Sequence, residues 1–190
     1  MVFLDIETQN DWSNGESFKI ENLKISYTGV IDSEGKEHDF WEKDTPQLFE
    51  FLKTADMIVH YNGFSFDMPV IANYVGPEVL ELPQIDLMVA MYKTIGFRPK
   101  LDDVATATLG QGKIGSGADA VKYWAAQDLD SLKKYCLQDV KVTMDVYNFG
   151  IKNGFVKYFD KNGFIRQVDI DWTLGQKLPA AVNTDAISMF

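Results

Sequence analysis

The sequence predicts an α/β domain in which helices flank a central mixed sheet. Two observations lead to this prediction: short apolar runs typical of strands are separated by helical segments, and most of those helical segments end at a glycine. The length of 190 residues and the apolar content of 46% suit one globular domain with a substantial core. We predict a single domain over residues 1–172, followed by a tail, 173–190, to which the sequence assigns no structure.

The first strand-like stretch is "VFLDIETQ", residues 2–9, which has apolar residues on both of its faces. Side chains of a strand alternate between its faces. One face therefore has Val2, Leu4 and Ile6, and the other has Phe3, Asp5 and Glu7. Unpaired buried carboxylates are costly, so the two acidic groups need compensation. A bound cation is one form of compensation, and other segments must then supply further ligands.

Residues 10–19 have the polar, glycine-containing composition of a loop. Residues 23–32 and 36–42 follow as two strands around the turn "SEG", which predicts a hairpin. A helix is expected over 45–55, with Asp44 or Thr45 as its N-cap, and a strand over 57–62.

Three further helices are expected around residues 65–76, 85–96 and 101–110, each with a terminal glycine. The glycine-rich loop 110–119 does not match a phosphate-binding loop, so we interpret it as a connection, with phosphate contact by Lys113 as the alternative.

The longest helix is expected from about Asp128 to Phe149. Its apolar stripe recurs at steps of three and four residues and comprises Leu129, Leu132, Cys136, Val140, Thr143 and Tyr147. A terminal hairpin is expected over 155–172 around the turn "KNG".

Composition limits the classes of function. One cysteine, Cys136, excludes an internal disulfide, and we expect it to be an inert core thiol. The sequence has no signal-peptide pattern and no apolar run long enough for a membrane span, which favours a cytoplasmic protein without membrane contact. The net charge of −10 argues against a protein that binds nucleic acid through general surface charge. Recruitment of such a substrate would then require a protein partner or a larger assembly.

Three segments carry carboxylates in positions that are unusual for a core. They are Asp5 with Glu7, Asp67 at the start of a helix, and Asp139 with Tyr135 one helical turn before it. Each has an ordinary alternative: an acidic strand end, a helix cap, and a surface pair. Together the four carboxylates suit two divalent cations, Mg²⁺ or Mn²⁺, which activate water for phosphodiester hydrolysis. Tyr135 would orient that water.

These motifs, "DIE", "NGFSFD" and "YCLQD", resemble in order and spacing those of the DEDD exonuclease superfamily. Over roughly residues 1–150 the chain is similar to the proofreading domains of family-B DNA polymerases, and its end resembles bacterial predicted 3′–5′ exonucleases. The resemblance implies a three-layer ribonuclease H-like fold and metal-dependent removal of nucleotides from 3′ ends. Tyr135 indicates the DEDDy branch, because the histidine branch would have a histidine where Lys134 stands.

The resemblance implies that Asp5, Glu7, Asp67 and Asp139 bind two metal ions and that Tyr135 completes the catalytic set. Thr8, Asn62 and Phe66 are the candidates for contact with the substrate, although Asn62 also suits a turn and Phe66 also suits the core. The expected substrate is a single-stranded 3′ end, DNA in the first instance and RNA as the alternative. Two other functions stay open: a non-catalytic module of the same fold that binds nucleic acid or acts as a scaffold, and an endonuclease.

Overall fold

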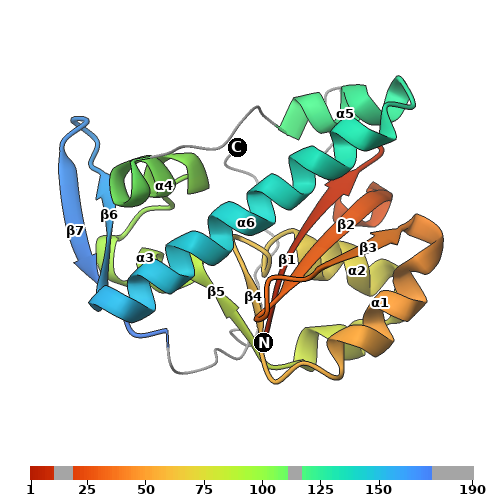
Figure 1. The fold of residues 1–190 in the computed structure, drawn as a ribbon, viewed down its shortest axis with the longest axis horizontal. Helices are drawn as coiled ribbons and strands as arrows, with labels where there is room; N and C mark the ends of the chain where they lie inside the picture. Colours follow the sequence, from red (N-terminus) through yellow and green to blue (C-terminus); the bar gives the residue numbers. More distant parts are fainter. Residues whose placement is uncertain (11–18, 111–116, 173–190) are drawn as a thin grey trace.

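The computed structural model describes residues 1–10, 19–110 and 117–172 (Figure 1). Its main sheet has five strands in the order β3-β2-β1-β4-β5: Glu37–Trp41, Ile25–Asp32, Val2–Thr8, Ile58–His60 and Gln84–Asp86. Strands β3, β2 and β1 pair antiparallel, whereas β1, β4 and β5 run parallel. The predicted α/β class with a mixed central sheet is therefore confirmed. The predicted loop around residues 10–19, Lys113 and the tail 173–190 lie largely or wholly outside the described residues.

Helices cover both faces of this sheet (Figure 1). Helices α1, Thr45–Leu52, and α2, Asp67–Val75, pack on one face. The long helix α6, Leu129–Asn153, crosses the other face. Three shorter helices contribute to the core on that second face: α3, Leu87–Ile95, α4, Leu101–Leu109, and α5, Gly117–Ala125. Two separate apolar cores result, one on each side of β1.

The alternation expected for β1 is present and divides its side chains between the two cores. Val2, Leu4 and Ile6 are buried in the core under α1 and α2. Phe3 is buried in the core under α6, where its ring packs edge-on against Tyr147 with the centroids 5.4 Å apart. Asp5 and Glu7 therefore lie on the face of the sheet that α6 covers.

The terminal hairpin consists of β6, Phe155–Phe159, and β7, Ile165–Asp169, which form a separate two-stranded sheet. Strand β6 is attached to α4 through one side chain: the Thr108 hydroxyl donates to the Lys157 carbonyl and accepts from the Lys157 amide, each at 2.9 Å. Beyond the hairpin, Trp172 returns to α6 and stacks on Tyr147, with ring centroids 5.7 Å apart. The hairpin is thus packed against the main body.

Three short 3₁₀ helices complete the described elements: Ile20–Asn22, Glu42–Asp44 and Pro77–Glu81. The second of them corrects the expected cap of α1. The Asp44 carboxylate accepts from the Trp41 amide, and the Thr45 hydroxyl donates to the Glu42 carbonyl, so neither side chain caps α1. Both close the preceding turn instead.

Other differences from the sequence-based expectation concern short elements and helix ends. Strand β5 occupies Gln84–Asp86, where we expected the start of a helix, and α5 was not expected. Helix α6 continues to Asn153, four residues beyond the expected end. Its first residue, Leu129, is 37% exposed and does not belong to the buried stripe, because it lies at the end of the helix. In the described part of the chain, no helix has the length and apolar composition needed to cross a membrane.

Candidate functional site

Asp5 and Glu7 lie near the carboxyl end of β1 and face α6. Glu7 is buried and Asp5 is partly exposed. The Cys136 thiol of α6 lies against them: its Sγ is 3.4 Å from the Asp5 carbonyl oxygen and 3.7 Å from Asp5 Oδ2. One ligand atom from each of Asp5, Glu7 and Cys136 falls within 4.8 Å of the other two. The first carboxylate pair and the long helix therefore meet directly.

Gly29 of β2 makes this close approach of α6 possible. It pairs with Asp5 across the sheet. A Cβ at position 29 would lie 3.1 Å from a Leu137 methyl carbon, 3.2 Å from Cys136 Sγ and 3.3 Å from a Val140 methyl carbon. Three side chains of α6 thus lie closer to this point than ordinary van der Waals contact, and a side chain here would require them to shift by a few tenths of an ångström.

Helix α6 also carries Tyr135 and Asp139, which flank Cys136 on the buried side. Tyr135 is 7% exposed and Asp139 is 5% exposed. Burial raises the pKa of the Cys136 thiol well above its usual range, and the negative charges of Asp5, Glu7 and Asp139 raise it further. Asp139 therefore belongs to the same acidic neighbourhood as the pair on β1. The ring of Tyr123 in α5 lies 6.5 Å from the Tyr135 ring, between centroids.

Asp67, the first residue of α2, joins the site through the backbone of β1. Strands β1 and β4 pair only as far as Phe3 and Val59, so the Ile6 amide has no partner on β4. Asp67 Oδ1 accepts a hydrogen bond from that amide at 3.0 Å, in place of an acceptor on β4. Burial raises the pKa of Asp67 to about 6, although the positive charge of His60 acts in the opposite direction. Asp67 is thus held between Asp5 and Glu7 along the strand.

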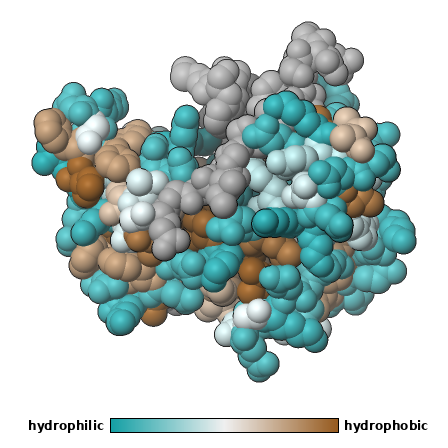
Figure 2. All heavy atoms as spheres, turned by 45° about the horizontal axis from the view of Figure 1, so that its top comes forward, coloured by the Kyte–Doolittle hydropathy of each residue, from teal (hydrophilic) through white to brown (hydrophobic). Residues whose placement is uncertain are grey.

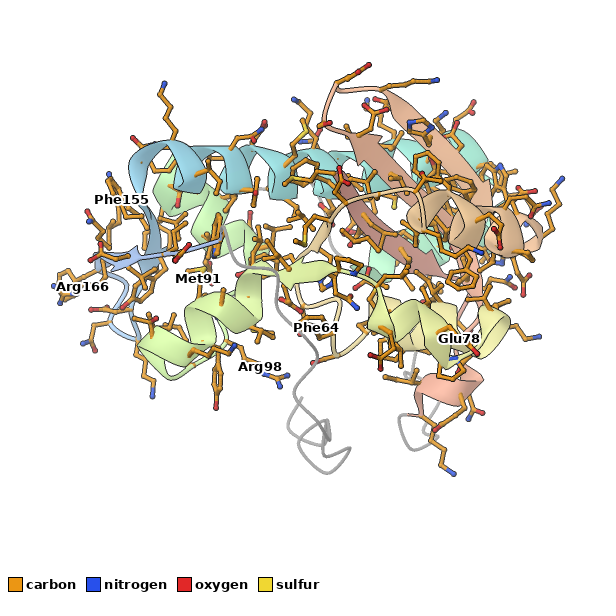
Figure 3. All side chains as sticks on the ribbon, turned by 90° about the horizontal axis from the view of Figure 1, so that it is seen from below. Phe64, Glu78, Met91, Arg98, Phe155 and Arg166 are labelled. Atoms are coloured by element: carbon orange, nitrogen blue, oxygen red, sulfur yellow. The ribbon has the colours of Figure 1, made fainter. Side chains whose placement is uncertain are left out.

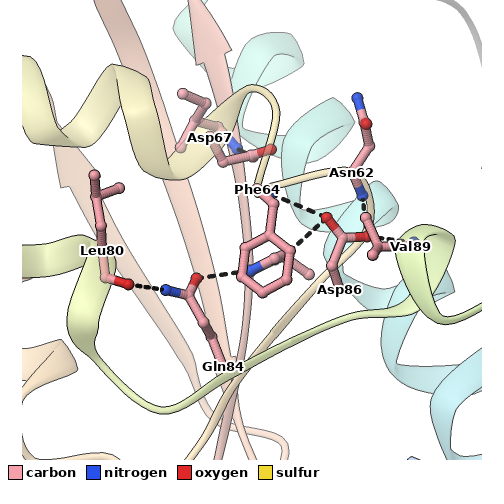
Figure 4. Close-up of polar contacts among 9 residues, drawn as sticks. Asn62, Phe64, Asp67, Leu80, Gln84, Asp86 and Val89 are labelled. Carbon is pink, nitrogen blue, oxygen red and sulfur yellow. Dashed lines mark hydrogen bonds and ion pairs between the residues drawn. The ribbon is translucent and has the colours of Figure 1, made fainter. Parts of the chain in front are cut away.

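A further acidic residue, Asp86, organises the loop that leads to Asp67, and the sequence analysis did not identify it. Its carboxylate accepts from the backbone amides of Asn62 at 2.9 Å, Phe64 at 3.0 Å and Val89 at 3.1 Å (Figure 4). Asp86 is completely buried. The bond to Val89 is an N-cap of α3, and an aspartate before the apolar run "LMVAM" is the signal that would have predicted it. The two bonds to the loop have no such sequence signal.

His60, which sequence reasoning would take for a packing residue, belongs to this buried network. Its Nε2 lies 3.0 Å from Gln84 Oε1, and its Nδ1 lies 3.6 Å from Asp86 Oδ2. The Gln84 amide in turn donates to the Leu80 carbonyl at 2.8 Å (Figure 4). Burial alone would lower the pKa of His60, but the Asp86 carboxylate outweighs it and raises this pKa. A Cβ on Gly63 would lie 2.5 Å from the His60 ring, so the loop packs tightly over the imidazole.

The three residues proposed for substrate contact lie at the borders of this cluster. Thr8 ends β1, is 7% exposed, and donates from its hydroxyl to the Asn10 carbonyl at 2.9 Å. Asn62 adopts a left-handed backbone with φ of 64°, consistent with the turn-forming alternative. Its Oδ1 is buried and accepts no hydrogen bond from the described residues. Phe66 precedes Asp67 and is partly buried against the core under α1 and α2.

The donor chemistry of this cluster favours a hard divalent cation. Asp5 and Glu7 each offer an oxygen within 4.8 Å of the other, Asp67 accepts from the backbone between them, and the charge of Asp139 acts on the same place from α6; oxygen ligands of this kind suit Mg²⁺ or Mn²⁺. Cys136 would suit zinc only as a thiolate. In the structure this thiol instead donates toward Asp5, which identifies it as part of the support beneath the carboxylates. The chemistry of these oxygen donors therefore fits a hard divalent cation.

Comparison with known proteins identifies a family and similar folds. A family model described as the RNase_H superfamily matches residues 2–149. The curated relative DNA polymerase 1 of Aeropyrum pernix is 23% identical over an alignment of 156 residues, and the match covers 66% of this chain and 16% of that protein. The solved family B DNA polymerase of the hyperthermophilic archaeon Pyrobaculum calidifontis matches with a TM-score of 0.59 and 20% identity, over 79% of this chain and 24% of that one.

The matched region thus spans less than a quarter of either polymerase, and the structural likeness concerns the fold alone. The family match has a wider basis, because it covers more than three quarters of this chain and contains β1, the Asp67 loop and most of α6. The three-layer arrangement around a five-stranded mixed sheet agrees with it. On these grounds the chain belongs to the RNase_H superfamily.

Proposed function

We propose that this chain is a metal-dependent 3′–5′ exonuclease of the DEDDy type that hydrolyses phosphodiester bonds at the 3′ ends of nucleic acid. Single-stranded DNA is the first expected substrate and RNA the second. The observation that carries the proposal is the meeting of Asp5 and Glu7 with the Tyr135–Asp139 turn of α6 over Gly29. Segments more than 120 residues apart in the sequence contribute acidic groups to one end of β1.

We assign Asp5, Glu7, Asp67 and Asp139 to the binding of two Mg²⁺ or Mn²⁺ ions. When bound, such ions supply an activated water and neutralise charge on the phosphate. Tyr135 orients the attacking water through its hydroxyl. The water oxygen bonds to phosphorus, the bond from phosphorus to O3′ of the penultimate nucleotide breaks, and the terminal nucleotide leaves as a 5′-monophosphate. Thr8, Asn62 and Phe66 are assigned to contact with that nucleotide.

The proposed catalytic unit is the single domain of residues 1–172, including the hairpin. The packing of Trp172 supports the inclusion of the segment after the hairpin in this domain. Trp172 is 1% exposed, and a Cβ on Gly150 of α6 would lie 2.5 Å from its ring. Glycine at this position thus allows the end of the domain to close against the helix that carries Tyr135 and Asp139.

Digestion of end-labelled strands tests the proposal. A 5′-labelled single strand should shorten to a ladder with Mn²⁺ or Mg²⁺ and stay intact in excess chelator. A strand with a blocked 3′ end should resist. Cleavage of a circular single strand would instead establish the endonuclease alternative. Binding without any cleavage, with either metal and on DNA and RNA alike, would establish the non-catalytic alternative.

A further inference from the structure

The net charge of −10 is distributed very unevenly along the chain. Residues 87–100, which form α3 and the loop after it, and residues 150–169, which form the end of α6 and the hairpin, together contain seven of the 18 Lys and Arg residues. They contain two of the 28 Asp and Glu residues. These two segments thus have a net charge of +5, and the rest of the chain has −15.

The two basic segments are adjacent in space. The Phe97 ring packs edge-on against the Tyr158 ring of β6, with the centroids 5.6 Å apart. We call the cations around this contact the basic corner: Arg98, Lys100, Lys157, Lys161 and Arg166. All but Lys157 are exposed, and Lys157 is partly so. Figure 3 shows Arg98 beyond the end of α3 and Arg166 at the outer edge of the hairpin.

The basic corner begins beside the candidate site. The Tyr61 hydroxyl donates to the Pro99 carbonyl at 2.7 Å, so the residue between Arg98 and Lys100 is bonded to the residue before Asn62. The Asn62 amide is in turn held by Asp86 in the loop that leads to Asp67. A continuous series of contacts therefore connects the carboxylate cluster, through Tyr61 and Pro99, to Phe97 and the hairpin.

The hairpin also presents an apolar surface among its charges. Phe164 is 61% exposed and Ile165 is 56% exposed. The Arg166 guanidinium lies 5.7 Å from the centre of the Phe164 ring and is paired with Asp160 at 2.8 Å. The hairpin forms the projection at the left of Figure 2, where brown apolar atoms lie beside teal polar atoms. Exposed aromatic rings among cations provide stacking surfaces for unpaired bases.

We propose that the basic corner binds the phosphates of a nucleic-acid single strand whose 3′ end lies at the carboxylate cluster, with Phe164 as a stacking surface. This inference rests on the proposed function, since it takes nucleic acid as the substrate. It also explains how a chain of net charge −10 holds a polyanion: attraction is limited to one corner. Asp102 and Asp103 follow the corner in sequence and Asp169 ends β7, and these acidic residues limit its extent.

The length of α6 determines how long a strand must be to contact both the carboxylate cluster and the hairpin. Fourteen residues separate Asp139 from Asn153, where the helix meets the hairpin. At about 1.5 Å per residue this is roughly 21 Å. Contact with the hairpin therefore requires a strand that spans at least this distance from the cluster. A trinucleotide bound at the cluster is too short to reach Lys157 and Lys161.

Fluorescence anisotropy of a labelled 20-nucleotide single strand in excess chelator tests the inference without cleavage. The variants are Arg98→Glu/Lys100→Glu and Lys157→Glu/Lys161→Glu. Each should weaken binding at low salt by about tenfold or more, and should reduce the salt slope by about 0.7 for each phosphate contact removed. Lys157→Glu/Lys161→Glu should bind a labelled trinucleotide as the wild type does.

The matched control is Lys36→Glu/Lys43→Glu, which makes the same change in charge at two exposed residues near β3, at the far edge of the sheet. It should bind like the wild type, and unchanged melting temperatures establish that all variants are folded. Equal affinity of the wild type and both corner variants would overturn the inference. If the corner variants bind more weakly but the wild type does not hydrolyse the strand, the role of the basic corner is supported and the proposed function is refuted. If the wild type hydrolyses the strand but the corner variants bind as it does, the proposed function is supported and the role of the basic corner is refuted.

Discussion

The two faces of β1 are built from neighbouring residues and have opposite chemistry. The face with Val2, Leu4 and Ile6 is covered by apolar side chains of α1 and α2. The other face begins with Phe3 in the core and then presents Asp5 and Glu7 to α6. One strand thus supplies stability on one side and concentrated negative charge on the other. Substitutions on the two faces should therefore separate activity from stability.

The largest effect is expected from Asp5→Asn, which removes one negative charge and almost no volume. If Asp5 binds metal as proposed, loss of this ligand costs several kcal/mol of transition-state stabilisation, which is roughly 10³-fold in rate. Steady-state hydrolysis of a labelled strand measures it. Asp56→Asn, at an exposed position, is the matched control. Wild-type turnover by the Asp5→Asn protein would show that Asp5 of β1 does not belong to the active site.

A smaller loss of activity is expected from Tyr135→Phe, which keeps the buried ring and removes the hydroxyl. Positioning of a proton-bearing group contributes roughly 10²–10⁴-fold, and we expect the lower end because the proposed metal ions would also activate the water. Turnover measured against Mn²⁺ concentration separates this variant from Asp139→Asn. Excess Mn²⁺ should partly restore Asp139→Asn and leave Tyr135→Phe unchanged. Full recovery of Tyr135→Phe at high Mn²⁺ would contradict its assignment.

On the apolar face, Leu4→Ala should affect stability and not chemistry. Leu4 is 1% exposed, and truncation of such a residue costs about 3 kcal/mol. Urea denaturation measures this loss, and turnover assayed well below the melting temperature should match the wild type. If turnover falls with stability, the two faces are coupled, and the separation proposed for β1 is wrong.

The smallest effect concerns the response of stability to pH through Asp67. Because the pKa of Asp67 is raised to about 6, the folded protein binds this proton more tightly than the unfolded chain does. Without metal, the stability contributed by this group is therefore lost as pH rises from about 4 to 6. Asp67→Asn should remove that part of the pH dependence in melting experiments. An unchanged slope between these pH values would show that Asp67 titrates normally.

Sequence reasoning succeeded where periodicity and spacing carry the information. The alternation in β1 and the stripe of α6 have regular periods, so the two faces of the strand and the burial of Cys136 were predictable. The stripe does not reveal what Cys136 contacts, and its position against Asp5 depends on the absence of a side chain at Gly29. That glycine lies in an ordinary strand sequence and carries no local signal.

The parts that the sequence did not reveal depend on non-local contacts or on very short elements. Strand β5 has three residues and is held by parallel pairing with β4, so its sequence alone is indistinguishable from the start of α3. The Asp86 carboxylate accepts hydrogen bonds from three backbone amides, two of which lie more than twenty residues earlier in the sequence. A lone aspartate before a helix predicts a cap, and only the fold reveals that it also shapes the Asp67 loop.

Gly29 has a consequence for how related chains are compared. The proposed ligands come from residues 5–7, 67 and 139, and an intact set of them is the usual reason to assume an active nuclease. The space between β2 and α6 is filled to within 3.3 Å of the Cβ that position 29 lacks. A single methyl group there would require the facing side chains of α6 to shift by a few tenths of an ångström while every acidic residue remained. A relative with all four carboxylates and a much larger residue at this position would retain the acidic motif, although α6 could not approach β2 as closely.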